Sequence, residues 1–201
     1  MKRVPRSTRA WRCLCLGVLW VTAWAGAAHA AGSLLAPAGA PGAFPLVSGD
    51  AVAPVVIDRA DAAVVGIAAR DLVADIERVT GFRGAVIEDG SSAAAFRVLV
   101  GTLGRSAPID ALVRAGKLDT SRLAGQWETF LISVIEDPVP GVDRALVIAG
   151  SDRRGTAFGV YELSQQIGIS PWHWWSDVPP RRSASLHLRG GTQLFGPPSV
   201  K

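Results

Sequence analysis

The sequence is poor in the residues that carry thiol and metal chemistry. Of its 201 residues, two are cysteine and three are histidine. Cys13 and Cys15 lie in an N-terminal stretch that we expect to be removed. The remainder then has no disulfides, cysteine nucleophiles or thiolate metal sites. The two histidines that remain, His173 and His187, do not make up a zinc site, so we expect no metal.

Motifs for nucleotide binding and for serine hydrolases are also lacking. The turn at 151–155 has neither the Gly-Lys-Ser/Thr of a P-loop nor the G-x-G-x-x-G spacing, which argues against nucleotides. No G-x-S-x-G elbow is present. Ser170, His173 and Asp177 crowd into one loop, which is a poor basis for a catalytic triad. The sequence therefore predicts no cofactor and offers no catalytic residue.

Without residues 1–30, the chain has no large excess of basic or of acidic residues. Residues 1–30 carry five basic residues and no acid, then an apolar run and the A-x-A site Ala28–Ala30. This pattern is typical of a cleaved signal peptide. Its removal leaves 16 basic and 17 acidic residues, which argues against a nucleic-acid partner or an anionic membrane. We expect a secreted or periplasmic protein, with no membrane attachment after signal removal.

The rest of the chain is long enough for one domain. Residues 31–45 are predicted to be a flexible lead-in, and residues 46–190 an α/β domain. Strands are predicted at 53–57, 84–88, 96–101, 128–136, 144–150 and 185–188, and helices at 61–80, 106–115 and 154–167. Because strands occur both in adjacent pairs and between helices, we expect an α/β fold (an α+β sandwich). Its helices pack on a mixed sheet.

The predicted helix at 61–80 has an apolar side and a charged side. Asp71, Asp75 and Arg78 fall opposite the apolar stripe, and we interpret them as solvated surface. Asp58 or Asp61 is a candidate cap for the start of this helix.

The turn before the predicted helix at 154–167 combines a cap and two cations. Asp152 is placed to accept hydrogen bonds from the first free N–H groups of the helix. Arg153 and Arg154 either contact an anion such as a uronic acid or pair with acids at a domain interface. Gly155 and Gly159, four residues apart, predict close packing of the helix against another backbone.

Three tryptophans follow the end of that helix. Trp172, Trp174 and Trp175, with His173 among them, form a Pro-Trp-His-Trp-Trp loop. Such a cluster either seals a core or domain interface or stacks on the C–H faces of sugar rings. The sequence leaves both interpretations open.

Three segments resemble the N-terminal domain of glycoside hydrolase family 115, which contains xylan α-1,2-glucuronidases. They are Asp75-Ile-Glu-Arg-Val-Thr-Gly81, Gly150-Ser-Asp-Arg-Arg-Gly-Thr156 with Gly159-Val-Tyr161, and Ser170-Pro-Trp-His-Trp-Trp-Ser-Asp-Val-Pro179. The tryptophan segment is the most specific. A similar strand, turn and helix also occur in the N-terminal domains of hexosaminidases and other α-glucuronidases.

The resemblance implies that 46–190 is an N-terminal α/β domain that precedes a (β/α)₈ barrel, with 191–201 as the linker toward that barrel. In the family that barrel carries the catalytic carboxylates, and no catalytic residue is transferred to this sequence. The resemblance predicts a non-catalytic domain or truncated product of a secreted α-glucuronidase-like enzyme. Its partners would be the missing barrel and, through the parent enzyme, a xylan-type polysaccharide. Alternatives are a free-standing carbohydrate-binding module and the N-terminal domain of a hexosaminidase-like enzyme.

Overall fold

The computed structural model describes residues 33–89 and 92–199. They fall within one compact unit, Ser33–Lys201. The predicted signal peptide at 1–30, with both cysteines, lies outside the described residues. No helix in the described part of the chain is long and apolar enough to cross a membrane.

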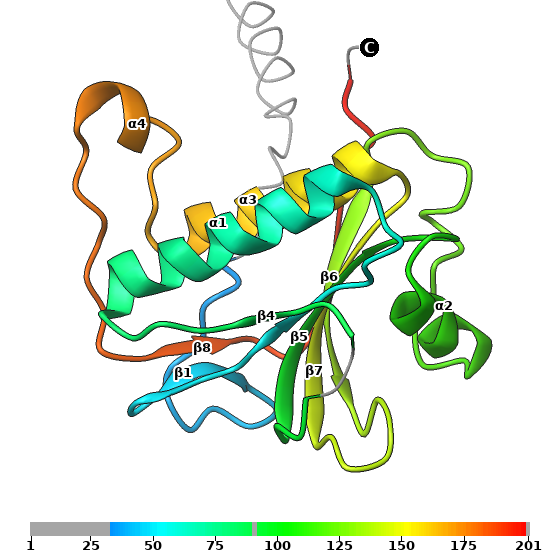
Figure 1. Ribbon diagram of the computed structural model, residues 1–201, viewed down its shortest axis with the longest axis horizontal. Helices are drawn as coiled ribbons and strands as arrows, with labels where there is room; N and C mark the ends of the chain where they lie inside the picture. The colour runs from blue at the N-terminus through cyan, green and yellow to red at the C-terminus, as the bar shows by residue number, and fades with distance from the viewer. Residues whose placement is uncertain (1–32, 90–91, 200–201) are drawn as a thin grey trace, which may run out of the picture. The chain divides into compact units, whose positions relative to one another are not determined.

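A six-stranded mixed sheet forms the centre of this unit (Figure 1). Its strand order is β4-β3-β5-β7-β6-β9. The strands are β3 (Val55–Val56), β4 (Val86–Ile87), β5 (Phe96–Thr102), β6 (Phe130–Glu136), β7 (Arg144–Gly150) and β9 (Gly191–Phe195). The first four in this order are parallel, whereas β6 is antiparallel to both β7 and β9. The expected α/β fold with a mixed sheet is confirmed.

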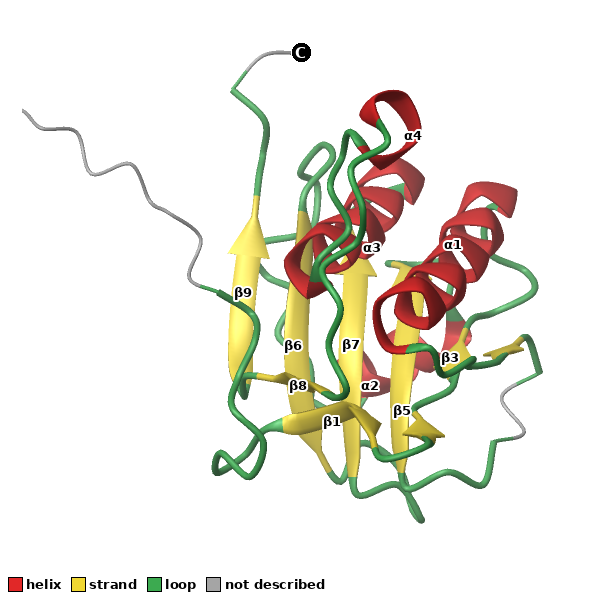
Figure 2. Ribbon diagram, turned by 90° about the vertical axis from the view of Figure 1, so that its left-hand side faces the viewer, coloured by secondary structure: helices red, strands yellow, loops and turns green. Residues whose placement is uncertain are grey.

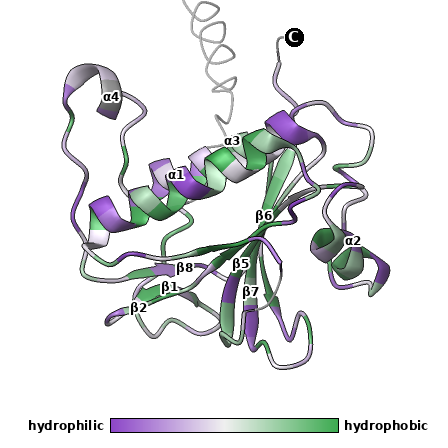
Figure 3. Cartoon of the chain, in the orientation of Figure 1, coloured by the Kyte–Doolittle hydropathy of each residue, from purple (hydrophilic) through white to green (hydrophobic). Residues whose placement is uncertain are grey.

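Helices cover both faces of this sheet. Figure 2 shows α1 (Ala63–Thr80) and α3 (Arg153–Ile167) side by side on one face, with α2 (Ala107–Arg114) behind the strands. Side chains alternate along a strand, so Val98 and Val100 of β5 pack toward α1 and α3, whereas Leu99 packs toward α2. Figure 3 shows the hydrophobic residues gathered along the middle of these strands. The alternation gives two cores, one on each side of the sheet.

A second, three-stranded sheet is built from segments far apart in the sequence. It contains β1 (Phe44–Ser48), β2 (Ala51–Val52) and β8 (Leu186–Leu188), in the order β2-β1-β8. Both pairs are antiparallel. Its buried residues join the core that lies under α1 and α3.

Two boundaries predicted from the sequence are corrected. In the expected lead-in at 31–45, Leu34 and Phe44 are buried, and Leu35 forms a bridge with Leu188. In the expected linker at 191–201, β9 pairs with β6, and its Leu194 packs on the core beside α2. Gly and Pro residues near both segments indicate loops. The short strands were therefore not predicted, because their pairing partners are distant in sequence.

Neither candidate cap of α1 caps that helix. The helix begins at Ala63 with Ala62 before it, and no side chain in the described part of the chain caps its first N–H groups. Asp58 Oδ2 instead accepts a hydrogen bond from the N–H of Ala107, the first residue of α2. Asp61 Oδ2 accepts from the N–H of Thr102 at the end of β5. These carboxylates therefore connect the loop before α1 to its neighbours in space.

Candidate functional site

The start of α3 is held by Asp152, as the sequence predicts. Its Oδ1 accepts hydrogen bonds from the N–H groups of Arg154 at 2.9 Å and Gly155 at 2.8 Å. Its Oδ2 accepts from the N–H of Glu128 at 2.8 Å, just before β6. Burial raises the pKa of Asp152, but these N–H groups and the charge of Arg154 outweigh burial and keep the pKa below its usual value.

Arg154 is engaged inside its own chain. Its guanidinium forms an ion pair with Glu128, whose side chain is 5% exposed, whereas that of Arg154 is 60% exposed. The same guanidinium lies 5.8 Å from the ring centre of Trp127 and 5.9 Å from that of Phe158. Arg153, the first residue of the helix, is exposed. The two adjacent arginines therefore have different environments.

Two glycines let α3 lie directly on the sheet. A Cβ on Gly155 would stand 2.6 Å from the carbonyl oxygen of Thr129, and one on Gly159 would stand 2.7 Å from Ile148 Cγ2. No larger residue fits at these distances without movement of the strands or the helix. The predicted close approach to another backbone is confirmed for Gly155, whereas Gly159 lies against the side chains of Ile148 and Phe130.

The strand β9 leaves the sheet beside this end of α3. Phe195, its last residue, pairs with Phe130 of β6, and the two rings stack at 4.8 Å between centres. The next residue, Gly196, lies against Thr129. The chain that follows β9 therefore starts close to the Asp152 cap.

The tryptophan loop lies at the other end of α3. A helix of 15 residues is about 22 Å long, so the structure does not bring Arg153 and Arg154 together with the tryptophans. The loop contains one short helix, α4 (His173–Ser176), which Figure 1 shows beyond the end of α3. Trp172 is 64% exposed and Trp175 is 83% exposed. Trp174 belongs to α4, and its side chain lies outside the described part.

Backbone bonds attach this loop to the unit. The N–H of Arg181 donates to the carbonyl of Gly168 at 3.1 Å, and the N–H of Ser183 donates to that of Val79 at 3.0 Å. Within the loop, Nδ1 of His173 lies 3.0 Å from the carbonyl oxygen of Val178. The loop is therefore fastened at its base and presents two tryptophans to solvent.

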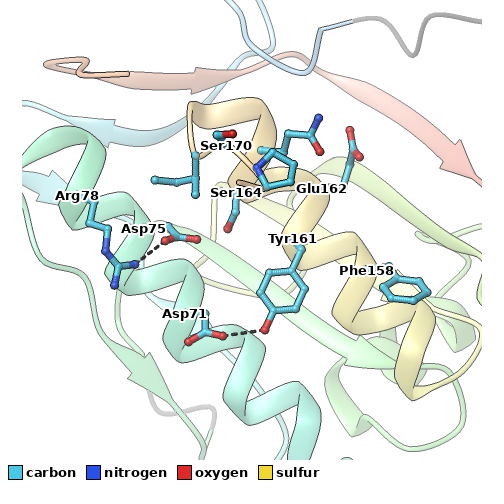
Figure 4. A pocket seen from close by; sticks show the side chains of 11 residues that line it. Asp71, Asp75, Arg78, Phe158, Tyr161, Glu162, Ser164 and Ser170 are labelled. Atoms are coloured by element: carbon cyan, nitrogen blue, oxygen red, sulfur yellow. Dashed lines mark hydrogen bonds and ion pairs between the residues drawn. The ribbon is translucent and has the colours of Figure 1, made fainter. Parts of the chain in front are cut away.

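A groove that the sequence did not predict runs between α1 and α3. Its volume is about 560 Å³. Across it the hydroxyl of Tyr161 donates to Asp71 Oδ2 at 2.7 Å (Figure 4). On the α1 side, Arg78 Nη1 donates to Asp75 Oδ1 at 2.6 Å. Burial, then the bond to Asp71 and the negative charges of Asp71 and Asp75, raise the pKa of Tyr161 to about 12.

The groove corrects the interpretation of one face of α1. Asp75, taken from the sequence as solvated surface, is 6% exposed, because α3 packs beside it. The spacing of Asp71 and Asp75 on one helix, and of Tyr161 and Ser164 on the other, places each pair on one face. Only the pairing of the two helices brings the faces together. Among the described residues, no group of three or more His, Cys, Asp or Glu side chains is placed to hold a metal ion.

Comparison with solved structures relates the chain to a glycoside hydrolase. A structure described as a family GH115 4-O-methyl-alpha-glucuronidase with specificity for decorated arabinogalactans matches with 33% identity and a TM-score of 0.61. The match covers 77% of this chain and 18% of that one, so this chain spans less than a fifth of the enzyme. The resemblance drawn from the sequence is confirmed at the level of fold. No protein-family model matches, and no curated protein matches.

Proposed function

We propose that this chain is the non-catalytic N-terminal domain of a secreted α-glucuronidase-like glycoside hydrolase. The observation that carries the proposal is the 33% identity to a family GH115 enzyme over 77% of the chain. The signal-peptide pattern at 1–30 supports export. The parent enzyme would remove (4-O-methyl)glucuronic acid side chains from plant polysaccharides. Glucuronoxylan is the first candidate and decorated arabinogalactan the second.

The carboxylates of this unit support a non-catalytic role. Glycosidases use two carboxyl groups that flank the scissile bond, one of them free to give a proton and one free to attack or to activate water. Three carboxylates line the groove: Asp71 accepts from Tyr161, Asp75 is paired with Arg78, and Glu162 accepts from Gln166. Each of these carboxylates therefore already has a partner within the unit. We therefore assign the chemistry to a separate barrel domain.

The barrel would dock against the Asp152 end of α3. The chain leaves β9 at this end, beside Thr129, so the polypeptide that follows begins here. Arg153 is exposed at the same place, and Trp127 is partly exposed. An exposed arginine and an aromatic ring are residues that protein interfaces favour.

An activity assay tests the assignment of chemistry. The full chain, incubated with glucuronoxylan and with glucuronic-acid-decorated arabinogalactan, should release no glucuronic acid. A product extended in frame past Lys201 into β/α repeats should release it. Release by the chain alone would contradict the non-catalytic role, and an in-frame continuation without β/α repeats would contradict the parent enzyme.

The docking surface has its own test in the extended product. Arg153→Ala should lower the melting temperature of that product and leave KM for glucuronoxylan unchanged, because the residue contacts the barrel and not the substrate. A raised KM with an unchanged melting temperature would instead place Arg153 in substrate recognition.

A further inference from the structure

The groove between α1 and α3 has the chemistry of a ligand site on a surface that the proposed function does not use. Its volume of about 560 Å³ is within the range of small-molecule sites, about 300–1,000 Å³. Figure 4 shows Asp71, Asp75 and Arg78 on α1 and Tyr161 and Ser164 on the facing side of α3. Phe158, which also lines the groove, lies on the other side of α3 in this view. Polar groups and aromatic rings therefore meet in one concavity.

Ser164 gives an independent indication of a ligand. The residue is 3% exposed and lines the groove. Among the described residues, its Oγ has no hydrogen-bond partner. A buried hydroxyl without a partner is costly, and most such groups in proteins are satisfied. Figure 4 shows Ser164 on the groove side of α3, near Asp75 and Tyr161. A ligand hydroxyl in the groove would provide the missing partner.

The charge of the groove selects the class of ligand. Asp71, Asp75 and Glu162 line it with one cation, Arg78, which is paired with Asp75. Carboxylates only accept hydrogen bonds, so this lining favours ligands that donate several. It repels anions, and free uronic acids are among these. A hydroxyl-rich neutral molecule meets both requirements.

The aromatic residues distinguish a sugar from other polar ligands. Phe158 and Tyr161 line the groove and are each partly exposed. Aromatic faces pack on C–H groups while neighbouring carboxylates accept from hydroxyls, and a pyranose ring offers both kinds of surface. At one end, Ser170 and Pro171 line the groove, and the exposed Trp172 follows directly. A saccharide longer than one unit would extend toward this tryptophan.

We propose that the groove between α1 and α3 binds a neutral saccharide, through Ser164 and Asp71 at its hydroxyls and Tyr161 at its ring face. This site differs from the Asp152 end of α3, where the barrel is proposed to dock, and the two surfaces meet at Phe158. The proposal does not depend on the parent enzyme, because binding is measured on this chain alone.

Isothermal titration calorimetry on the full chain tests the proposal with defined probes. The probes are xylohexaose, a neutral β-galactan hexamer, free glucuronate and tetralysine. We expect one of the two neutral oligosaccharides to bind with a Kd of about 1 mM or tighter, and glucuronate to bind at least tenfold more weakly. Absence of binding by both neutral probes overturns the proposal. Tighter binding of glucuronate or tetralysine also overturns it.

Substitutions in the groove test whether the saccharide binds there. Ser164→Ala should weaken binding about 3- to 10-fold, the loss expected for one hydrogen bond. Tyr161→Ala should weaken it about tenfold or more, because the ring face is removed. The matched control is Ser106→Ala, since Ser106 is another buried serine whose Oγ has no partner in the described residues, at the start of α2. Its Kd should not change.

The variants also separate a site from a fold effect. Ser164→Ala and Ser106→Ala remove equivalent buried hydroxyls, so their melting temperatures should be similar. Loss of binding in Ser164→Ala alone then supports the site. Equal binding by Ser164→Ala and the unaltered chain overturns the assignment to this groove.

Discussion

The N-terminal end of α3 is fastened to the sheet, whereas the loop beyond its C-terminal end is exposed. At the first end, Asp152 accepts from three backbone N–H groups, and Arg154 pairs with the buried Glu128. At the second, Trp172 and Trp175 are mostly exposed. Both segments attract attention in the sequence for their unusual composition. The comparison shows that the contacts of each segment, and not its unusual residue composition, determine whether it is packed against the sheet or exposed.

The two ends of α3 differ because only the first of them lies next to the ends of the sheet strands. The helix starts directly after β7, so its first turns lie against β6 and β7, and Gly155 is in contact with Thr129. The loop after Gly168 continues past the packed helices and is held at its base by backbone bonds from Arg181 and Ser183. Four predictions, ordered from the largest expected effect to the smallest, test this contrast.

Substitution of Gly155 should have the largest effect. Gly155→Ala places a methyl group 2.6 Å from the carbonyl oxygen of Thr129, directly before β6, so we expect a loss of about 3 kcal/mol in the free energy of unfolding. Urea unfolding measures it. The matched control is Gly66→Ala in α1, where the nearest atom would be 3.5 Å away.

The Gly66 control should change stability in the opposite direction. Alanine has the higher helix propensity, so Gly66→Ala should gain about 0.5–1 kcal/mol. Equal stability of Gly155→Ala and Gly66→Ala would contradict the close contact between Gly155 and Thr129.

The two arginines should differ from one another. Arg154→Ala leaves the buried carboxylate of Glu128 without its cation, and we expect a loss of about 2 kcal/mol, or roughly 4–8 °C in melting temperature. Arg153→Ala changes an exposed side chain and should stay within about 0.5 kcal/mol of the unaltered chain. Equal losses in the two variants would contradict the different roles given to these neighbours.

The pKa of Tyr161 can be measured directly, because Tyr161 is the sole tyrosine of the sequence. This pKa reports on the contacts in the groove. The ultraviolet absorbance of Tyr161 should titrate with a midpoint at about pH 12. Asp71→Asn should lower that midpoint toward the ordinary value of about 10, since the bond to a charged acceptor is lost. A midpoint near 10 in the unaltered chain would refute the contact with Asp71.

The sign of the accompanying stability change is fixed by the raised pKa. The unfolded chain loses the phenol proton at about pH 10, whereas the folded chain keeps it to about pH 12. The contribution of Tyr161 is therefore fully present below pH 10 and is lost between about pH 10 and 12.

The sequence predicted the parts of the fold that depend on local patterns. The long strands at 128–136 and 144–150, the helix at 154–167 and the Asp152 cap follow from periodicity and capping chemistry, and the structure has them with small shifts at the ends. The strand β9 and the buried Phe44 were missed because their partners are far away in sequence. Distant pairing is set by the whole core, which no local pattern contains.

The candidate site shows the same division. For Trp172 and Trp175 the sequence left open a core or domain interface and a sugar contact. Both side chains are mostly exposed, so they are not part of the described core. A domain interface and a sugar contact both stay predictions. The groove was missed altogether, since its two walls, near Asp75 and Tyr161, come from helices separated by a large part of the chain. A charged helix face therefore predicts solvent exposure well only when nothing packs beside it.

The melting temperature of a Trp172→Ala/Trp175→Ala double variant tests the contrast between the two ends of α3 most directly. Both rings are mostly in solvent, so we expect a change of no more than roughly 2 °C, compared with the several degrees lost by Arg154→Ala. Differential scanning calorimetry of the two variants and the unaltered chain gives the comparison. A larger loss in the tryptophan variant than in Arg154→Ala would show that the loop, and not the Asp152 end, is built into the fold.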